Sequence, residues 1–242
     1  MIIVSQPRSG THMVRTALNR HPKLKVATEI FNGLANPKLP REYSALQGQV
    51  KVAQELVARN KHFTIHLYDP HDLPGLWPGW QAQVVLQRRH LPTTVSPMLF
   101  LYRKNKLRQA ISRLEAEMSG HFDQYKYKQN QGTLRCPPWL MIEQIRIFQR
   151  ADKEAKRVQE QAASRGVWTH RVSYEELRAD WDAQMKKIQT GAGVSPKQLT
   201  PATLKQGDRP MSERVRNWKQ LVDAFRETDY WNFVQEIIDD ES

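Results

Sequence analysis

The residues best suited to chemistry stand near the start of the chain. Pro-Arg-Ser-Gly-Thr-His at 7–12 separates the β-favouring run at 2–4 from a stretch with helical spacing. The pattern predicts a strand, a turn and a helix over residues 11–19, which ends before His21-Pro22. Backbone N–H groups at a helix start have no partner within the helix, and the helix dipole adds positive potential there. The segment is therefore typical of a loop that binds phosphate or sulfate.

Side chains of the same loop add to this potential. Arg8 supplies a fixed positive charge, and Ser9, Thr11 and His12 supply hydrogen-bond donors beside Gly10. The loop is not a Walker A motif, because no Gly-x-x-x-x-Gly-Lys-Ser/Thr occurs here. The lysine and the Mg-binding hydroxyl of a nucleotide triphosphatase are therefore not placed as that motif needs them.

Two further residues could act as a general base. Glu29 lies between apolar neighbours in a short extended stretch at 24–31, and His66 lies in the predicted strand at 62–68. Partial desolvation raises the proton affinity of a carboxylate, and a neutral imidazole is a competent base near pH 7. A surface Glu in a loop and a structural His on a strand are the alternative interpretations of these two residues.

An arginine and a serine follow another predicted strand. The run at 83–87 is β-favouring, Arg88 ends it, and a helix begins near Pro92 with Ser96 eight residues after the arginine. Guanidinium and hydroxyl groups are both hydrogen-bond donors, which phosphate accepts well. Arg103 and Ser112 form a second such pair, ranked lower because residues 96–117 fit one long basic helix.

The remaining pattern predicts one α/β domain over residues 1–242, with a central parallel sheet flanked by helices. A long amphipathic helix is expected over 139–163, and Gly166 ends it. A late strand follows from residue 167, and Ser173 with Glu176 forms a capping box at the start of the next helix. The long helix also offers a surface on which two copies could pair.

Several of these motifs, in this order, resemble the sulfotransferases that use 3'-phosphoadenosine 5'-phosphosulfate (PAPS). Pro7–Thr11 is similar to the Pro-Lys/Arg-Ser-Gly-Thr loop of that family, and Tyr174–Leu177 to its Tyr-Glu-Asp-Leu. His21-Pro22 followed by Glu29 is similar to the order in tyrosylprotein and several bacterial members. The resemblance implies a P-loop-like fold and sulfuryl transfer from PAPS to a hydroxyl or amine acceptor, which leaves adenosine 3',5'-bisphosphate (PAP).

The resemblance also implies roles for individual residues. Glu29 would be the base, with His66 as its competitor by likeness to the cytosolic members, and Arg8 would stabilise charge during transfer. The other implied cofactor-binding residues are Ser9, Gly10, Thr11 and His12 in the loop, Arg88 and Ser96 at the 3'-phosphate, and Lys205 and Arg209 in a basic loop near the end of the chain.

Composition indicates the charge of the binding partners but not their identity. The formal charge of +12 and the pI near 9.9 imply anionic partners. Cys136 is the single cysteine, so neither an intrachain disulfide nor a cysteine-based metal site is expected, and no His and carboxylate spacing predicts a metal. No run approaches 18 apolar residues and the first strand begins at residue 2, so we expect a cytoplasmic protein without a signal peptide or a membrane span.

Two other classes of protein remain as alternatives. A nucleotide-dependent kinase would share the strand, loop and helix but would need Mg and ATP, and the missing Walker lysine counts against it. A basic nucleic-acid-binding protein would explain the charge, but no helix-turn-helix or zinc-finger pattern supports it. The sequence does not identify the hydroxyl-bearing acceptor.

Overall fold

The structure, a computed structural model, describes residues 1–29, 62–66, 97–119, 133–201 and 209–241. It confirms the predicted α/β class, with a central parallel sheet flanked by helices. The strands are β1 (Ile2–Ser5), β2 (Val26–Glu29), β3 (His62–His66), β4 (Met98–Tyr102) and β5 (Thr169–Ser173). The helices are α1 (Thr11–Leu18), α4 (Lys106–Ser119), α5 (Pro138–Ser164), α6 (Tyr174–Ala179), α7 (Trp181–Gly191), α8 (Met211–Arg214), α9 (Trp218–Phe225) and α10 (Trp231–Glu241).

Within the described residues the sheet has five strands in the order β2-β3-β1-β4-β5, and every neighbouring pair is parallel. The first strand is therefore central. Its residues are buried, as are those of β4 up to Leu101, because helices cover both faces of the sheet. The carboxyl ends of all five strands lie at one edge, which is where ligands bind in open α/β sheets.

One predicted element is wrong. Residues 96–117 do not form a single helix, because Met98–Tyr102 is strand β4, paired with β1 on one side and β5 on the other. The run Met-Leu-Phe-Leu-Tyr is apolar throughout, which suits a strand buried on both faces. The helix starts only at Lys106, after Asn105 accepts a hydrogen bond from the Arg108 backbone N–H at 2.9 Å.

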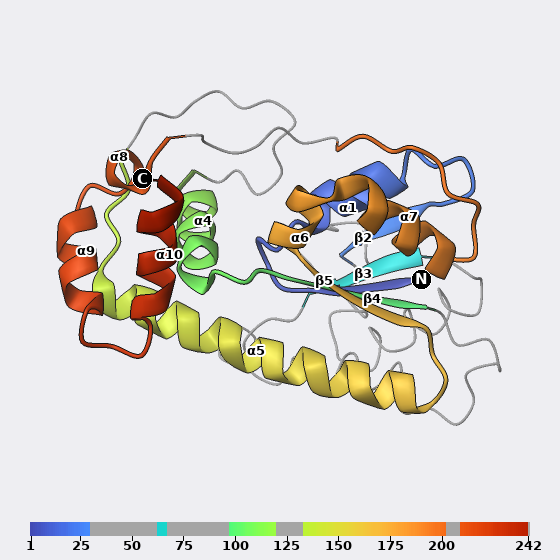
Figure 1. Ribbon diagram of the computed structural model, residues 1–242, viewed down its shortest axis with the longest axis horizontal. Coiled ribbons are helices and arrows are strands. Elements are labelled where there is room, and N and C mark those ends of the chain that lie inside the picture. The colour runs from blue at the N-terminus through green and yellow to red at the C-terminus, as the bar shows by residue number, and fades with distance from the viewer. Residues whose placement is uncertain (30–61, 67–96, 120–132, 202–208, 242) are drawn as a thin grey trace, which may run out of the picture.

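Helices cover the two faces of the sheet unequally (Figure 1). On one face α1, α6 and α7 pack against the sheet in a cluster that includes Ile3, Val14, Leu18, Leu177 and Ile188. On the other face α5 runs along β4 and β5 and continues past the carboxyl edge. Beyond that edge a second cluster joins α4 and α5 to the C-terminal helices α8, α9 and α10.

Two local predictions are confirmed. The long helix α5 spans Pro138–Ser164, within a residue of the predicted bounds, and Pro138 stands in its first turn, where a proline is tolerated. The capping box at the end of β5 is present, since the Ser173 Oγ accepts from the Glu176 N–H at 3.1 Å. The Glu176 carboxylate in turn accepts from the Ser173 N–H at 2.8 Å.

Cys136 is buried in the second cluster, and Asn217 holds its backbone through two hydrogen bonds of 2.8 and 2.9 Å. Burial raises the pKa of the thiol from 9.0 to about 12. We therefore expect iodoacetamide at pH 8 to alkylate Cys136 in the native protein about a thousandfold more slowly than in urea, because the thiolate is the reactive form. Equal rates would show that this segment opens readily.

Candidate anion-binding site

The loop between β1 and α1 has an unusual backbone. Arg8 and Gly10 both have left-handed dihedrals, with φ of 63° and 88°. Gly10 is also the N-cap of α1, and no side chain caps the helix there. The first-turn N–H groups therefore depend on something other than a capping side chain, as expected of a helix start that accepts an anion.

The hydroxyl groups of Ser9 and Thr11 make their contacts within the loop. Ser9 is fully buried, and its Oγ donates to the Gln6 carbonyl at 2.7 Å and lies 3.4 Å from the Thr11 Oγ1. The single proton of Ser9 is used in this contact, so Ser9 stabilises the turn. His12 is half-buried, and its Nδ1 is 3.1 Å from an Arg15 guanidinium nitrogen.

Gly10 is required for a steric reason as well as a conformational one. A Cβ on this residue would lie 3.0 Å from the Cδ2 of the Tyr174 ring, the first residue of α6. We expect Gly10→Ala to lower the free energy of unfolding by about 2 to 4 kcal/mol, from left-handed strain and this contact together. Urea denaturation would measure the loss.

Gly193→Ala is the matched control for this substitution. Gly193 has a φ of 75°, and no atom of the described residues lies within 4 Å of a Cβ built there. It therefore reports backbone strain without a steric clash. Equal losses in the two variants would show that the Tyr174 contact costs nothing.

A serine of helix α4 contacts the loop. The Arg8 Nε donates to the Ser112 Oγ at 3.0 Å, across a separation of 104 residues. Ser112 lies on α4, which follows β4 through Arg103, Lys104 and Asn105. Arg103 and Ser112 therefore stand in the order strand, arginine, turn, helix and serine, which is the same order that the sequence predicts around Arg88.

Arg103 is held at the carboxyl end of β4. Its guanidinium carbon lies 4.9 Å from the centre of the Tyr174 ring, and its Nε lies 3.8 Å from the Glu175 carboxylate. Within the described part of the chain this Nε is buried and has no hydrogen-bond partner. A buried guanidinium nitrogen that lacks a hydrogen-bond partner, beside a phosphate-type loop, fits an anionic ligand.

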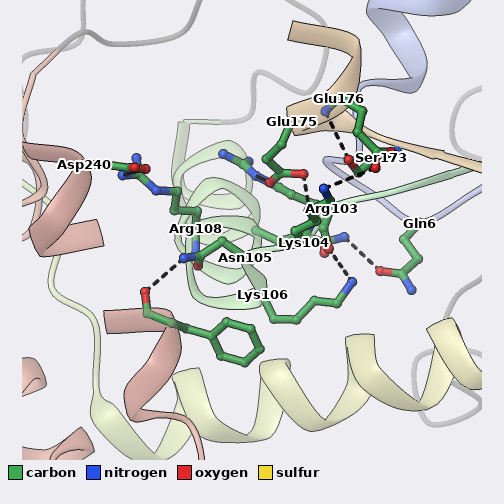
Figure 2. A network of polar contacts seen from close by, with 12 residues as sticks. Gln6, Arg103, Lys104, Asn105, Lys106, Arg108, Ser173, Glu175, Glu176 and Asp240 are labelled. Atoms are coloured by element: carbon green, nitrogen blue, oxygen red, sulfur yellow. Dashed lines mark hydrogen bonds and ion pairs between the residues drawn. The ribbon is translucent and has the colours of Figure 1, made fainter. Parts of the chain in front are cut away.

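More cations lie around Arg103 (Figure 2). Burial, together with the charges of Arg108 and Arg214, lowers the pKa of Arg103 to about 10, which leaves it protonated at neutral pH. Arg108 pairs with Asp240 of α10 at 3.1 Å, and Arg214 of α8 makes a bidentate pair with Glu115 at 2.6 and 3.1 Å. The arginines of α4 and α8 therefore belong to the surroundings of the site, and the C-terminal helices bring Arg214 there.

Comparisons with solved structures find sulfotransferases. A sulfotransferase from Alicyclobacillus acidocaldarius has a TM-score of 0.49 and 12% identity, over 96% of this chain and 97% of that one. Mouse sulfotransferase SULT7A1 complexed with PAP has a TM-score of 0.43 and 14% identity, over 96% of this chain and 74% of that one. Likenesses this distant do not assign an activity to this chain. No family model and no curated protein matches the sequence.

The two candidate bases lie at the same edge of the sheet as the loop. His66 ends β3, where its backbone pairs with Ser5, the last residue of β1. Glu29 ends β2 and is paired with Thr64, which lies opposite Ile3. Both backbones are therefore on the β3 side of the loop, whereas Arg103 and Ser112 are on the β4 side.

Other predicted residues lie elsewhere. Arg88, Ser96 and Lys205 fall outside the described residues, as does the predicted strand at 83–87. Arg209 precedes α8, among the C-terminal helices. Among the described residues, no cluster of three or more His, Cys, Asp or Glu is arranged to hold a metal. In the same residues, no helix combines the length and the apolar character that a membrane crossing needs.

The reason for ranking Arg103 and Ser112 lower, a single helix over 96–117, is wrong, and the contact of Tyr174 with Gly10 was not predicted. The signal for strand β4 was present, because the five apolar residues at 98–102 directly precede Arg103. No sequence signal indicates the contact of Tyr174 with Gly10, because the two residues are brought together only by the packing of α6 beside the loop.

Proposed function

We propose that this protein is a sulfotransferase that moves a sulfuryl group from PAPS to a hydroxyl or amine acceptor. The observation that carries the proposal is the hydrogen bond from the Arg8 Nε to the Ser112 Oγ. It joins the Pro7–Thr11 loop, which resembles a phosphosulfate loop, to a strand, arginine, helix and serine unit. Two independent sequence features of the family thus meet at one edge of the sheet.

The donors at this edge fit a nucleotide that carries phosphate at both the 5' and the 3' position. The N–H groups at the start of α1 and the Arg8 guanidinium suit the 5' side. Arg103 provides a guanidinium whose Nε is buried, and Ser112 provides a buried hydroxyl, for the 3'-phosphate. In this proposal they take the role that sequence analysis gave to Arg88 and Ser96.

PAPS supplies an activated sulfuryl group, and the residues of this chain position it. Sulfuryl transfer resembles phosphoryl transfer, in which orientation and charge stabilisation provide most of the rate. Arg8 and the α1 amides would stabilise charge on the sulfuryl oxygens and on the departing 5'-phosphate. Glu29, or His66 in its place, would accept the proton of the acceptor hydroxyl.

The strand order supports this division of roles. β1 carries the loop and lies between β3 and β4. The 3'-phosphate would therefore bind on the β4 side, and the acceptor would approach from the side of β2 and β3. Nucleotide and acceptor would meet over the loop, as in-line displacement requires.

Calorimetric titration with PAP, AMP and ATP, each with and without Mg, tests the proposal. We expect micromolar binding of PAP that does not need Mg, and weaker binding of AMP because it lacks the 3'-phosphate. Binding of ATP only with Mg would favour a kinase instead. No binding of any nucleotide would favour a nucleic-acid partner, whose affinity falls steeply with salt.

Transfer itself is tested with ³⁵S-labelled PAPS and a panel of a phenol, a tyrosyl peptide, a sugar and a primary amine. We expect label to appear on at least one acceptor while PAP is released in equal amount. Binding of PAP without transfer to any of the four acceptors would support the nucleotide site and contradict sulfuryl transfer to these classes of acceptor.

A further inference from the structure

A partly buried ionic cluster connects the two halves of the candidate site. Its centre is Asp152 of α5, a residue that sequence analysis did not single out. The Asp152 Oδ1 accepts a hydrogen bond from the Gln6 Nε2 at 2.7 Å, and its Oδ2 pairs closely with the Lys106 ammonium. Arg171 of β5 lies 3.6 Å from the Oδ1. The Asp152 carboxylate therefore connects α5 to α4, to β5 and to the residue that follows β1.

Gln6 relates this cluster to the loop. It directly precedes Pro7 and Arg8, and its Nε2 also donates to the Phe148 carbonyl of α5 at 2.9 Å. Gln109 of α4 donates to the Gln6 Oε1 at 3.0 Å and to the Pro7 carbonyl at 2.8 Å. The Gln6 side-chain amide therefore bonds to both α4 and α5, and these two helices hold the start of the loop in place.

Lys106 connects the Asp152 carboxylate to Arg103, and Figure 2 shows Lys106 beside Arg103. Its side chain is 5% exposed, and its Nζ donates to the Arg103 carbonyl at 2.6 Å. Lys106 and Arg171 also both face the Tyr102 ring, at 5.7 and 4.3 Å from its centre. The strand end that presents Arg103 is therefore held by a lysine whose counter-ion is Asp152.

We propose that Asp152 is a positioning residue of the nucleotide site, which sets the spacing of Arg8 and Arg103 through Gln6 and Lys106. The proposal rests on the proposed function. A site for one ligand with two phosphates needs a fixed distance between its two arginines, and pre-organised donors bind more tightly than mobile ones. Asp152 has no need to touch the nucleotide for this role.

Asp152→Asn and Lys106→Met test the role through the affinity for PAP, measured by calorimetry. We expect each to raise the Kd by about ten- to a hundredfold, because each removes charged hydrogen bonds of the network. Glu160→Gln is the matched control on the same helix, since its pair with Lys156 is exposed. This control should bind PAP as the wild type does.

The double variant Lys106→Met, Asp152→Leu separates positioning from stability. Replacing a buried ion pair by apolar residues often leaves stability unchanged or raised, whereas removing one partner lowers it. We expect the double variant to regain the urea midpoint lost in the single variants while its Kd stays at least tenfold weaker. Lys156→Met, Glu160→Leu is the surface control for adding two apolar side chains.

The outcomes distinguish this inference from the proposed function. If the wild type binds no PAP, both fail together. If the wild type binds PAP and Asp152→Asn binds it equally well, only the positioning role fails. Recovery of affinity together with stability in the double variant would also overturn the positioning role, because the network would then serve stability alone.

Discussion

Arg103→Ala is expected to weaken the binding of PAP by about a hundredfold or more. The substitution removes a buried guanidinium whose Nε lacks a hydrogen-bond partner among the described residues. A bidentate contact of arginine with phosphate is worth about 3 kcal/mol when it is shielded from water, and 1.4 kcal/mol is tenfold in affinity. AMP should lose little affinity, because it has no 3'-phosphate. Calorimetry with both nucleotides measures the difference.

Three companion variants show whether the loss is specific. Arg103→Lys keeps the charge but not the planar fork, so it should recover only part of the affinity. Lys104→Ala removes a neighbouring charge that pairs with Glu176 at the surface, and it should change PAP binding little. Arg88→Ala tests the other candidate for the same role. A larger loss of PAP affinity in Arg88→Ala than in Arg103→Ala would return the 3'-phosphate role to Arg88.

The sequence was sufficient for elements whose signals are local. The run at 2–4, the Pro7–Gly10 turn and the helix after it are neighbours in the chain, and turn chemistry defines them. The capping box of Ser173 and Glu176 spans only three residues, so its spacing alone indicated the helix start. Helix α5 is long and periodic, which is the pattern that sequence reading detects most reliably.

The sequence was insufficient where distant contacts decide the structure. Residues 98–102 include Met and Leu, which suit a helix, as well as Phe and Tyr, which suit a strand, and the basic run after them made one long helix seem simplest. Pairing with β1 and β5 makes them a strand, and that pairing depends on the whole sheet. The contacts of Asp152 with Gln6 and Arg8 with Ser112 cross more than 100 residues, and no local pattern specifies them.

Glu29→Gln is expected to lower turnover of PAPS by about a hundredfold or more, with little change in the Kd for PAP. A general base contributes about 10²- to 10⁴-fold to a rate, and an amide cannot accept the proton. Because Gln preserves the size of the side chain, nucleotide binding on the far side of the loop should be retained. Single-turnover transfer from ³⁵S-labelled PAPS to the best acceptor of the panel gives the rate.

His66→Asn is the decisive comparison, because the sheet register makes His66 a strong competitor. Strands lie about 4.8 Å apart, so the His66 backbone is about 5 Å from Ser5, whereas Glu29 is two strands from β1 and level with Ile3. If Glu29 is the base, the acceptor must extend from the loop across β3 to β2. If His66 is the base, the acceptor hydroxyl binds on β3, next to the loop. If His66→Asn abolishes turnover and Glu29→Gln does not, the base is His66 and the acceptor binds close to β1. Loss in both variants would mean that His66 and Glu29 serve the same proton transfer from adjacent strands.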